Sequence, residues 1–246
     1  MSSSKFNKVF CIGLHKTGTT SLHNFFLNLG IKSVHKTSWS KTPIPNEYLQ
    51  KNRAFSDGGG HFWYDESEFC SNHEVRLLDE TYPNSKFLLN TRPLKSWVVS
   101  KLLHAGWKEG IELQPPKIVT HEEWKYKSID VVKKWITNRY KYHEKVKKYF
   151  EYRPDDILYI DITKDTDPAK KIINFLNLDK KISVVDEFNF IQKMLNIISF
   201  EKKYVLSDLP HENKNKGKAT LKDREFCAEV YEIAISEMDK DIIQLA

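Results

Sequence analysis

A pattern suited to binding a phosphate-like anion occupies residues 9–22, VFCIGLHKTGTTSL. An apolar run leads into a glycine, a lysine follows, and a second glycine precedes three hydroxyl residues. Glycines let the backbone curl so that successive N–H groups point at one spot, and the start of a helix adds free N–H donors and partial positive charge. The pattern predicts a strand, an anion-binding loop and a helix, with candidate binding residues His15, Lys16, Thr17, Gly18, Thr19, Thr20 and Ser21.

The position of the lysine distinguishes this loop from that of nucleoside triphosphatases. Gly13 and Gly18 have the spacing of the pattern G-x-x-x-x-G-K-[ST], in which the lysine contacts the β- and γ-phosphates and the next hydroxyl contacts magnesium. Here Thr19 occupies the lysine position, and the lysine comes three residues earlier, as Lys16. A magnesium-dependent nucleotide kinase is therefore an alternative that this sequence disfavours.

A second anion-binding arrangement follows the apolar segment 86–92, KFLLNTR. The segment ends in Arg92, Pro93 suits the first turn of a helix, and Ser100 lies eight residues after the arginine. The guanidinium group is a planar fork that fits a phosphate, and its long side chain can reach over the first helical turns. Arg92 and Ser100 are therefore predicted to converge on one anion.

These two motifs resemble those of sulfotransferases that use 3′-phosphoadenosine 5′-phosphosulfate (PAPS). The resemblance is carried by Lys16-Thr17-Gly18-Thr19-Thr20-Ser21 and by the Arg92/Ser100 pair, and it extends loosely through residue 178. It implies that Lys16 contacts the bridging oxygen and the sulfuryl group, that the following residues hold the 5′-phosphate, and that Arg92 and Ser100 hold the 3′-phosphate. His15 stands where many members have proline.

The same resemblance suggests a general base and a further phosphate contact. The family's base lies in the loop after a neighbouring strand, and the matching stretch here, FSDGGGH, offers Asp57 first and His61 second, with His104 a distant third. Asp57 would lie at the carboxyl edge of the sheet, where ligands bind in open α/β folds. A lysine-rich stretch near the C-terminus matches weakly a loop that closes over the 3′-phosphate, with Asn215 in place of arginine followed by Lys216, Gly217 and Lys218.

Short apolar runs alternate with helical stretches along the chain. This alternation predicts one α/β domain over residues 1–246, a parallel sheet with helices on both faces as in P-loop nucleotide kinases, with residues 1–7 flexible. Residues 106–120, which include a Pro-Pro pair, are expected to form a loop. The expected strands are 8–13, 53–57, 86–92 and 157–163, and the expected helices are 19–29, 64–82, 93–106, 122–150, 168–178 and 221 to the end.

Composition limits the classes of protein to which the chain could belong. Of the 246 residues 40% are hydrophobic and 29% charged, which suits a folded domain, and the net charge of +6 suits an anionic ligand. Three distant cysteines argue against a disulfide framework, and no apolar run reaches the length of a membrane span.

We therefore expect a cytoplasmic sulfotransferase, a monomer or homodimer, that transfers a sulfuryl group from PAPS to a small-molecule or carbohydrate hydroxyl or amine. The expected product is adenosine 3′,5′-bisphosphate (PAP), with no metal, nucleic-acid or membrane partner. A non-catalytic anion-binding module is the second alternative.

Overall fold

A parallel sheet of five strands forms the centre of the protein in the computed structural model, which describes residues 6–36, 46–57, 75–105, 121–178 and 221–238. The strand order is β2-β3-β1-β4-β5, and every neighbouring pair is parallel. The strands are β1 (Val9–Cys11), β2 (Ser33–His35), β3 (Ala54–Ser56), β4 (Lys86–Thr91) and β5 (Ile157–Asp161). The predicted parallel α/β fold is confirmed.

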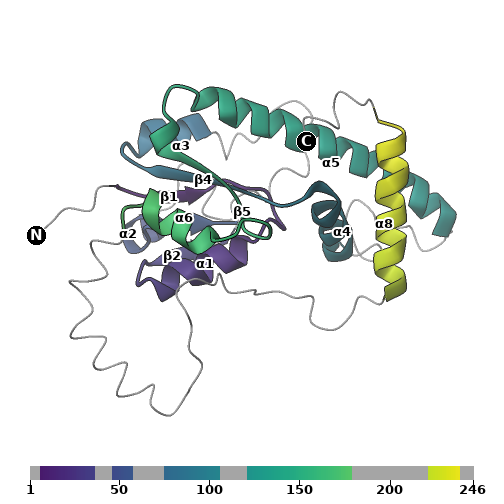
Figure 1. Cartoon of the computed structure of the whole chain (residues 1–246), viewed down its shortest axis with the longest axis horizontal. Helices are drawn as coiled ribbons and strands as arrows, with labels where there is room; N and C mark the ends of the chain where they lie inside the picture. The colour runs from purple at the N-terminus through teal and green to yellow at the C-terminus, as the bar shows by residue number, and fades with distance from the viewer. Residues whose placement is uncertain (1–5, 37–45, 58–74, 106–120, 179–220, 239–246) are drawn as a thin grey trace, which may run out of the picture.

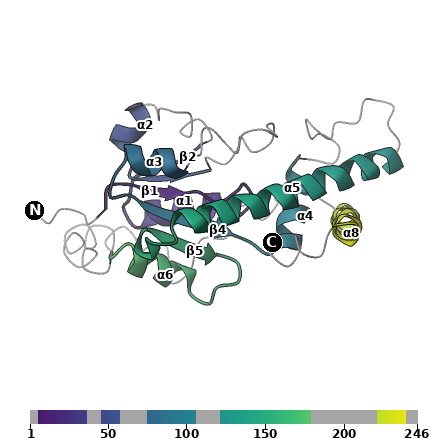
Figure 2. The ribbon, with the colours of Figure 1, turned by 90° about the horizontal axis from the view of Figure 1, so that it is seen from above.

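Helices cover both faces of this sheet (Figures 1 and 2). One face packs against α1 (Thr19–Asn28) and α6 (Pro168–Phe175). The other packs against α3 (Val75–Thr81), α4 (Leu94–Ala105), α5 (His121–Tyr149) and α8 (Leu221–Ser236). In the sequence, the short helix α2 (Asn46–Lys51) comes between β2 and β3.

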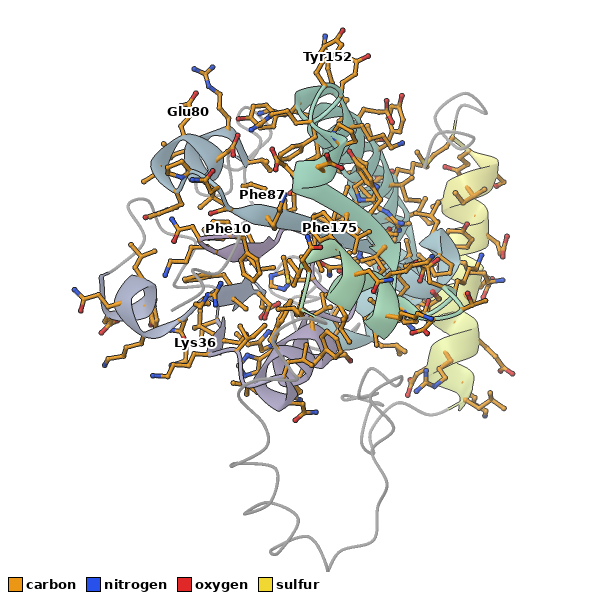
Figure 3. The ribbon with its side chains drawn as sticks, turned by 60° about the vertical axis from the view of Figure 1, so that its left-hand side comes forward. Phe10, Lys36, Glu80, Phe87, Tyr152 and Phe175 are labelled. Atoms are coloured by element: carbon orange, nitrogen blue, oxygen red, sulfur yellow. The ribbon has the colours of Figure 1, made fainter. Side chains whose placement is uncertain are left out.

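Alternation along the strands explains the two layers of core. Phe10 packs in the core layer shared with α3, α4, α5 and α8, whereas its neighbours Val9 and Cys11 pack in the layer shared with α1 and α6, because successive side chains of a strand point to opposite faces. The Phe10 ring lies 5.2 Å from that of Phe55 and 5.6 Å from that of Phe87, centroid to centroid. Figure 3 shows Phe10 and Phe87 in the interior of the protein. This packing of side chains from three strands fixes the sheet edge on which the candidate residues lie.

The helix α8 closes one end of the molecule, across α4 and α5 (Figure 1). Its buried residues Cys227, Val230 and Ala234 join the core on the α5 side. An ion pair of 2.6 Å between Lys95 and Glu232 links α4 to α8 at the surface. The C-terminal helix predicted from residue 221 is thus confirmed through Ser236.

Three local findings differ from the sequence expectations, the first being that the short helix α2 was not predicted. The strand β2 was not predicted, because only three residues form it and only Val34 among them is fully buried. Phe6, in the segment expected to be flexible, is 4% exposed and packs in the core beside α1. Within the described ranges, no helix has the length and apolarity needed to cross a membrane.

Candidate functional site

The candidate residues gather at the carboxyl edge of the sheet. The loop of residues 12–18 follows β1, Asp57 follows β3, Arg92 follows β4, and Asp161 ends β5. In a parallel sheet these ends all lie on the same side, which is where open α/β folds bind ligands. Three predicted positions, the loop with Lys16, Asp57 and Arg92, are thereby brought together.

Asn90 holds the loop in its curled shape from within β4. Its amide oxygen accepts a hydrogen bond of 3.1 Å from Gly13 N–H, and its Nδ2 donates to Thr17 Oγ1 at 2.6 Å. Thr17 Oγ1 in turn donates to the carbonyl of Leu14 at 2.5 Å. The hydroxyl of Thr17, predicted to bind the ligand, is therefore engaged within the protein, and Thr17 is 1% exposed. Sequence reasoning missed Asn90, although a polar residue inside the apolar run KFLLNTR was a signal.

Both glycines of the loop are required by close approach of other groups. A Cβ on Gly13 would lie 2.1 Å from the carbonyl oxygen of Asn90, and one on Gly18 would lie 1.8 Å from Cδ1 of Ile162. Gly18 also has a φ of 91°, in the left-handed region that favours glycine. Lys16 has a φ of 66°, uncommon for a residue with a side chain. The loop is thus a curled and constrained segment.

Two helices behind the sheet fix the backbone of the loop. Trp97, on α4, donates its indole N–H to the carbonyl of His15 at 2.9 Å. Tyr142, on α5, donates its hydroxyl to the carbonyl of Ile12 at 2.7 Å. Both side chains are buried, at 1% and 3% exposed. The carbonyl groups on either side of Gly13 and Leu14 therefore point toward the helices.

The histidine side of the site consists of His15, His35 and Asp57. His15 Nδ1 lies 2.7 Å from Asp57 Oδ1, and Thr19 donates its hydroxyl to the same oxygen at 3.2 Å. His35 Nε2 lies 3.6 Å from the other oxygen, Oδ2. Asp57 itself has a φ of 65°, a conformation that Asp tolerates better than most residues. The carboxylate predicted as general base is therefore the partner of two histidines.

His35 makes further contacts that sequence reasoning did not anticipate. Its Nε2 lies 3.1 Å from Thr20 Oγ1, and its Nδ1 lies 3.1 Å from Ser56 Oγ. Its ring stacks on that of His23 at 5.6 Å between centroids. Thr20, a predicted ligand contact, is thus joined to β2 through this ring. Sequence reasoning missed His35 because it did not predict the strand β2, on which this residue lies.

The arginine side of the site consists of Arg92, Arg139 and Asp161. Arg92 donates from Nε to Ser96 Oγ at 3.0 Å and from Nη1 to the carbonyl of Lys16 at 3.4 Å. Ser96 comes one turn of α4 before the predicted partner, Ser100, which is half-buried on the same helix. Arg92 therefore reaches the first turn of α4, where Ser96 is its hydroxyl contact, and it also reaches the loop at Lys16, which was not predicted.

Arg139 of α5 supports Arg92 from behind. Its Nη2 donates to the carbonyl of Arg92 at 2.6 Å and to Thr91 Oγ1 at 2.9 Å. It is 3% exposed, and its Nε and Nη1 have no hydrogen-bond partner in the part of the chain that the structure describes. Burial lowers the pKa of Arg139 to about 10, so it stays cationic at neutral pH. The sequence patterns did not identify Arg139 as part of the site.

Charge and burial act against each other on the two central groups. Burial lowers the pKa of Lys16, and Arg92 adds to this effect while Asp57 opposes it. For Asp57, burial by itself would raise the pKa, but the hydrogen bond and charge of His15, together with His35 and Thr19, outweigh it and lower the pKa. Asp57 is thus held as a carboxylate, while Lys16 and Arg92 leave cationic charge available to an anion.

The remaining predicted positions divide into two groups. Thr19 and Ser21 lie in the first turn of α1, 5% and 7% exposed. Residues His61, Lys216, Gly217 and Lys218 lie outside the described residues, as does the side chain of His104. Asp161, at the end of β5, accepts hydrogen bonds from the N–H of Thr163 at 2.9 Å and from the hydroxyl of Thr163 at 2.7 Å. Within the described ranges no three His, Cys, Asp or Glu residues form a group that could hold a metal ion.

Comparison with known proteins agrees with this geometry. No curated protein matches the chain. The family model of the sulfotransferase domain matches residues 8–160, which contain the loop, Asp57, Arg92 and four crossovers of the sheet, and which make up more than half of the chain. The chain therefore belongs to the sulfotransferase domain family.

Proposed function

We propose that the protein transfers a sulfuryl group from PAPS to a hydroxyl or amine acceptor and releases PAP. The observation that supports this best is the place of Lys16, inside the loop and three positions before the lysine of a nucleoside triphosphatase. With Arg92 donating to its carbonyl, Lys16 lies between two anion-binding elements, the start of α1 and the start of α4. A ligand with phosphates at both ends fits such an arrangement.

The residues present fit the charge of the proposed donor. PAPS brings roughly four negative charges at neutral pH, about two of them on its 3′-phosphate. Lys16, Arg92 and Arg139 supply three cations within one cluster, and the N-terminus of α1 adds partial positive charge. Nε and Nη1 of Arg139 are buried without a hydrogen-bond partner among the described residues, which is consistent with a cationic cluster that an anionic ligand would complete.

Each residue then has a defined part in the reaction. Backbone N–H groups of residues 16–21 and the hydroxyl groups near the start of α1 bind the 5′-phosphate. Arg92, with Ser100 and the lysine-rich residues 216–218, binds the 3′-phosphate. The ammonium group of Lys16 stabilises the negative charge that develops on the leaving oxygen, a contact that accelerates the reaction because it strengthens in the transition state.

A titration of the purified chain with PAP tests the donor, and ATP with magnesium serves as the comparison. We expect calorimetry to show PAP binding without any metal and no comparable binding of ATP. Incubation with radiolabelled PAPS and a panel of phenols, alcohols and sugars then identifies the acceptor. A chain that binds ATP and magnesium, ignores PAP and phosphorylates an acceptor would be a kinase, contrary to this proposal.

A further inference from the structure

The arrangement around Asp57 bears on the step that the proposed function leaves open, the removal of the acceptor proton. Sulfuryl transfer leaves a proton to be taken from the attacking hydroxyl or amine, and a general base near the sulfur accelerates this step. A group qualifies by geometry first, because it needs a free lone pair close to the reacting atoms. Three groups near Lys16 come into question: Asp57, His35 and His15.

Asp57 is poorly suited to take the proton. One of its oxygens receives His15 and Thr19, and the other lies 3.6 Å from His35. Its pKa is lowered, so the carboxylate holds a proton weakly. A carboxylate in this setting orients and stabilises its neighbours more readily than it accepts a proton from an alcohol.

His35 is engaged at both ring nitrogens. Nδ1 lies 3.1 Å from Ser56 Oγ, and Nε2 lies 3.1 Å from Thr20 Oγ1. Burial also lowers its pKa, with Asp57 opposing this and His15 adding to it. Its contacts join α1 to β2 and β3, which is the work of a structural residue.

His15 has the one ring nitrogen in this group that remains available. An ionised carboxylate only accepts hydrogen bonds, so Nδ1 of His15 carries the proton directed at Asp57 Oδ1. In the neutral ring Nε2 then holds a lone pair, and it has no hydrogen-bond partner among the described residues. His15 is half-buried, with 18% of its side chain exposed.

The backbone brings His15 next to the residue that contacts the reacting group in the proposed function. It directly precedes Lys16, and its carbonyl is fixed by the indole N–H of Trp97 at 2.9 Å. The charged or titratable groups that interact with it are Asp57, which follows β3, and His35 from β2; Lys16 is its neighbour in the chain, and Arg92 acts on Lys16. Asp57 is the anion among them that directly contacts its ring and can balance a positive imidazolium.

We propose that His15 is the general base of the sulfuryl transfer and that Asp57 is the residue that positions it; this rests on the proposed function. A lone pair of the acceptor oxygen or nitrogen forms the new bond to sulfur, and the acceptor proton moves to Nε2 of His15. The bond from sulfur to the bridging oxygen breaks, and its electron pair leaves with PAP beside Lys16. The imidazolium, held by Asp57, then returns its proton to solvent.

The substitution His15→Asn tests this assignment most directly. The Asn amide N–H can still donate to Asp57 but cannot accept the proton, so the loop is kept while the base is lost. We expect kcat to fall by about 10²–10⁴, the usual contribution of a general base, with PAP affinity close to that of the wild type. We expect kcat/KM of the wild type to fall at acid pH and this fall to be absent in His15→Asn. The matched control is His23→Asn, which replaces the histidine whose ring stacks on His35. This variant should keep turnover near the wild-type level.

Two further variants keep the result interpretable. In His15→Gly, added imidazole should restore turnover in proportion to its concentration, which a purely structural role of His15 would not allow. Asp57→Asn should lower kcat, and adding it to His15→Asn should cause little further loss, because the two residues act as one unit. Additive losses in this cycle, or no rescue by imidazole, would overturn the assignment.

The possible failures can be told apart. A wild-type chain that binds PAP but transfers no sulfuryl group to any acceptor would remove the proposed function and this base with it. An active wild type in which His15→Asn keeps full turnover would overturn the base alone. Loss of the acid-side fall in His61→Asn, with its retention in His15→Asn, would assign the proton transfer to His61 instead.

Discussion

The two sides of the loop bury opposite kinds of charge. On the histidine side, Asp57 is a carboxylate that receives His15 and lies beside His35. On the arginine side, Arg92 and Arg139 are cations. The carboxylate of Asp161 accepts hydrogen bonds from the turn that follows it, at Thr163, and not from the two arginines. Lys16 lies between, influenced by both Asp57 and Arg92. The difference indicates a division of work, in which one side handles a proton and the other binds phosphate.

After His15→Asn, the substitution with the largest expected effect is at Lys16, where the two sides meet. Lys16→Met keeps most of the side-chain volume and removes the charge. We expect kcat to fall by about 10²–10³, as for loss of one preorganised donor to developing charge, with PAP affinity changed much less. Turnover equal to that of the wild type, measured with radiolabelled donor, would remove Lys16 from the reaction.

The arginine side should respond in affinity rather than in turnover. Arg92→Ala removes a charged hydrogen-bond donor, which costs about 1.5–3 kcal/mol and so roughly 10–150-fold in Kd for PAP. Calorimetric titration measures this change, and kcat at saturating donor should fall far less than in His15→Asn. Lys95→Ala, on the exposed part of α4, is the control. Unchanged affinity in Arg92→Ala would contradict the division between the two sides.

The rigidity of the loop that joins the two sides can be tested with a pair of glycines. Both Gly18 and Gly30 have left-handed backbone, with φ of 91° and 72°, but a Cβ on Gly18 would meet Ile162, whereas nothing lies within 4 Å at Gly30. Gly30→Ala should cost about 1–2 kcal/mol of unfolding free energy from strain alone. Gly18→Ala should cost about 1–3 kcal/mol more, from overpacking. Equal values in urea denaturation would mean that Ile162 yields freely.

The smallest expected effect concerns His143 on α5. Burial, with the charges of Arg139 and Lys147, lowers its pKa to about 3, below the 6.5 of an exposed histidine. The unfolded chain therefore binds a proton that the folded chain does not, and stability present above pH 6.5 is lost as the pH falls toward 3.

We expect His143→Leu to flatten this part of the stability curve. For each proton taken up on unfolding, the unfolding free energy falls by about 1.4 kcal/mol per pH unit. The stability lost between pH 7 and pH 5 should therefore be smaller in His143→Leu than in the wild type, by roughly 1 kcal/mol or more. Urea denaturation at several pH values measures the difference. If stability depended on pH in the same way in both proteins, the pKa of His143 would not be lowered by folding, contrary to this expectation.

Much of the fold could be predicted from local patterns. Apolar runs such as KFLLNTR and ILYIDIT define β4 and β5, because a run of consecutive apolar residues marks a strand locally. The Asp167-Pro168 pair marks the start of α6, where the Asp167 side chain accepts from Lys170 N–H at 2.9 Å. β2 escaped prediction because three residues with one buried side chain give too little pattern.

The phosphate loop was also readable, whereas its supports were not. Gly13, Lys16 and Gly18 belong to one short segment, so their spacing is a property of the sequence. Asn90 holds this loop from 77 residues away, and Arg139 supports Arg92 from 47 residues away; no local pattern pairs such distant positions. Asp57 was recognised as chemically important, but its contact with His15 depends on how β3 lies beside β1.

The sequence by itself determined the strand–loop–helix that can bind an anion, the position of its lysine, and the alternation that leads to a parallel sheet. These features arise from backbone geometry and burial over a few consecutive residues. Tertiary structure decided which side chains stay free for chemistry. In it, Asn90 hydrogen-bonds to the hydroxyl of Thr17, His15 hydrogen-bonds to Asp57, and Arg139 hydrogen-bonds to the carbonyl of Arg92. Those assignments depend on which strands are neighbours, because side chains become partners only when packing brings their elements together.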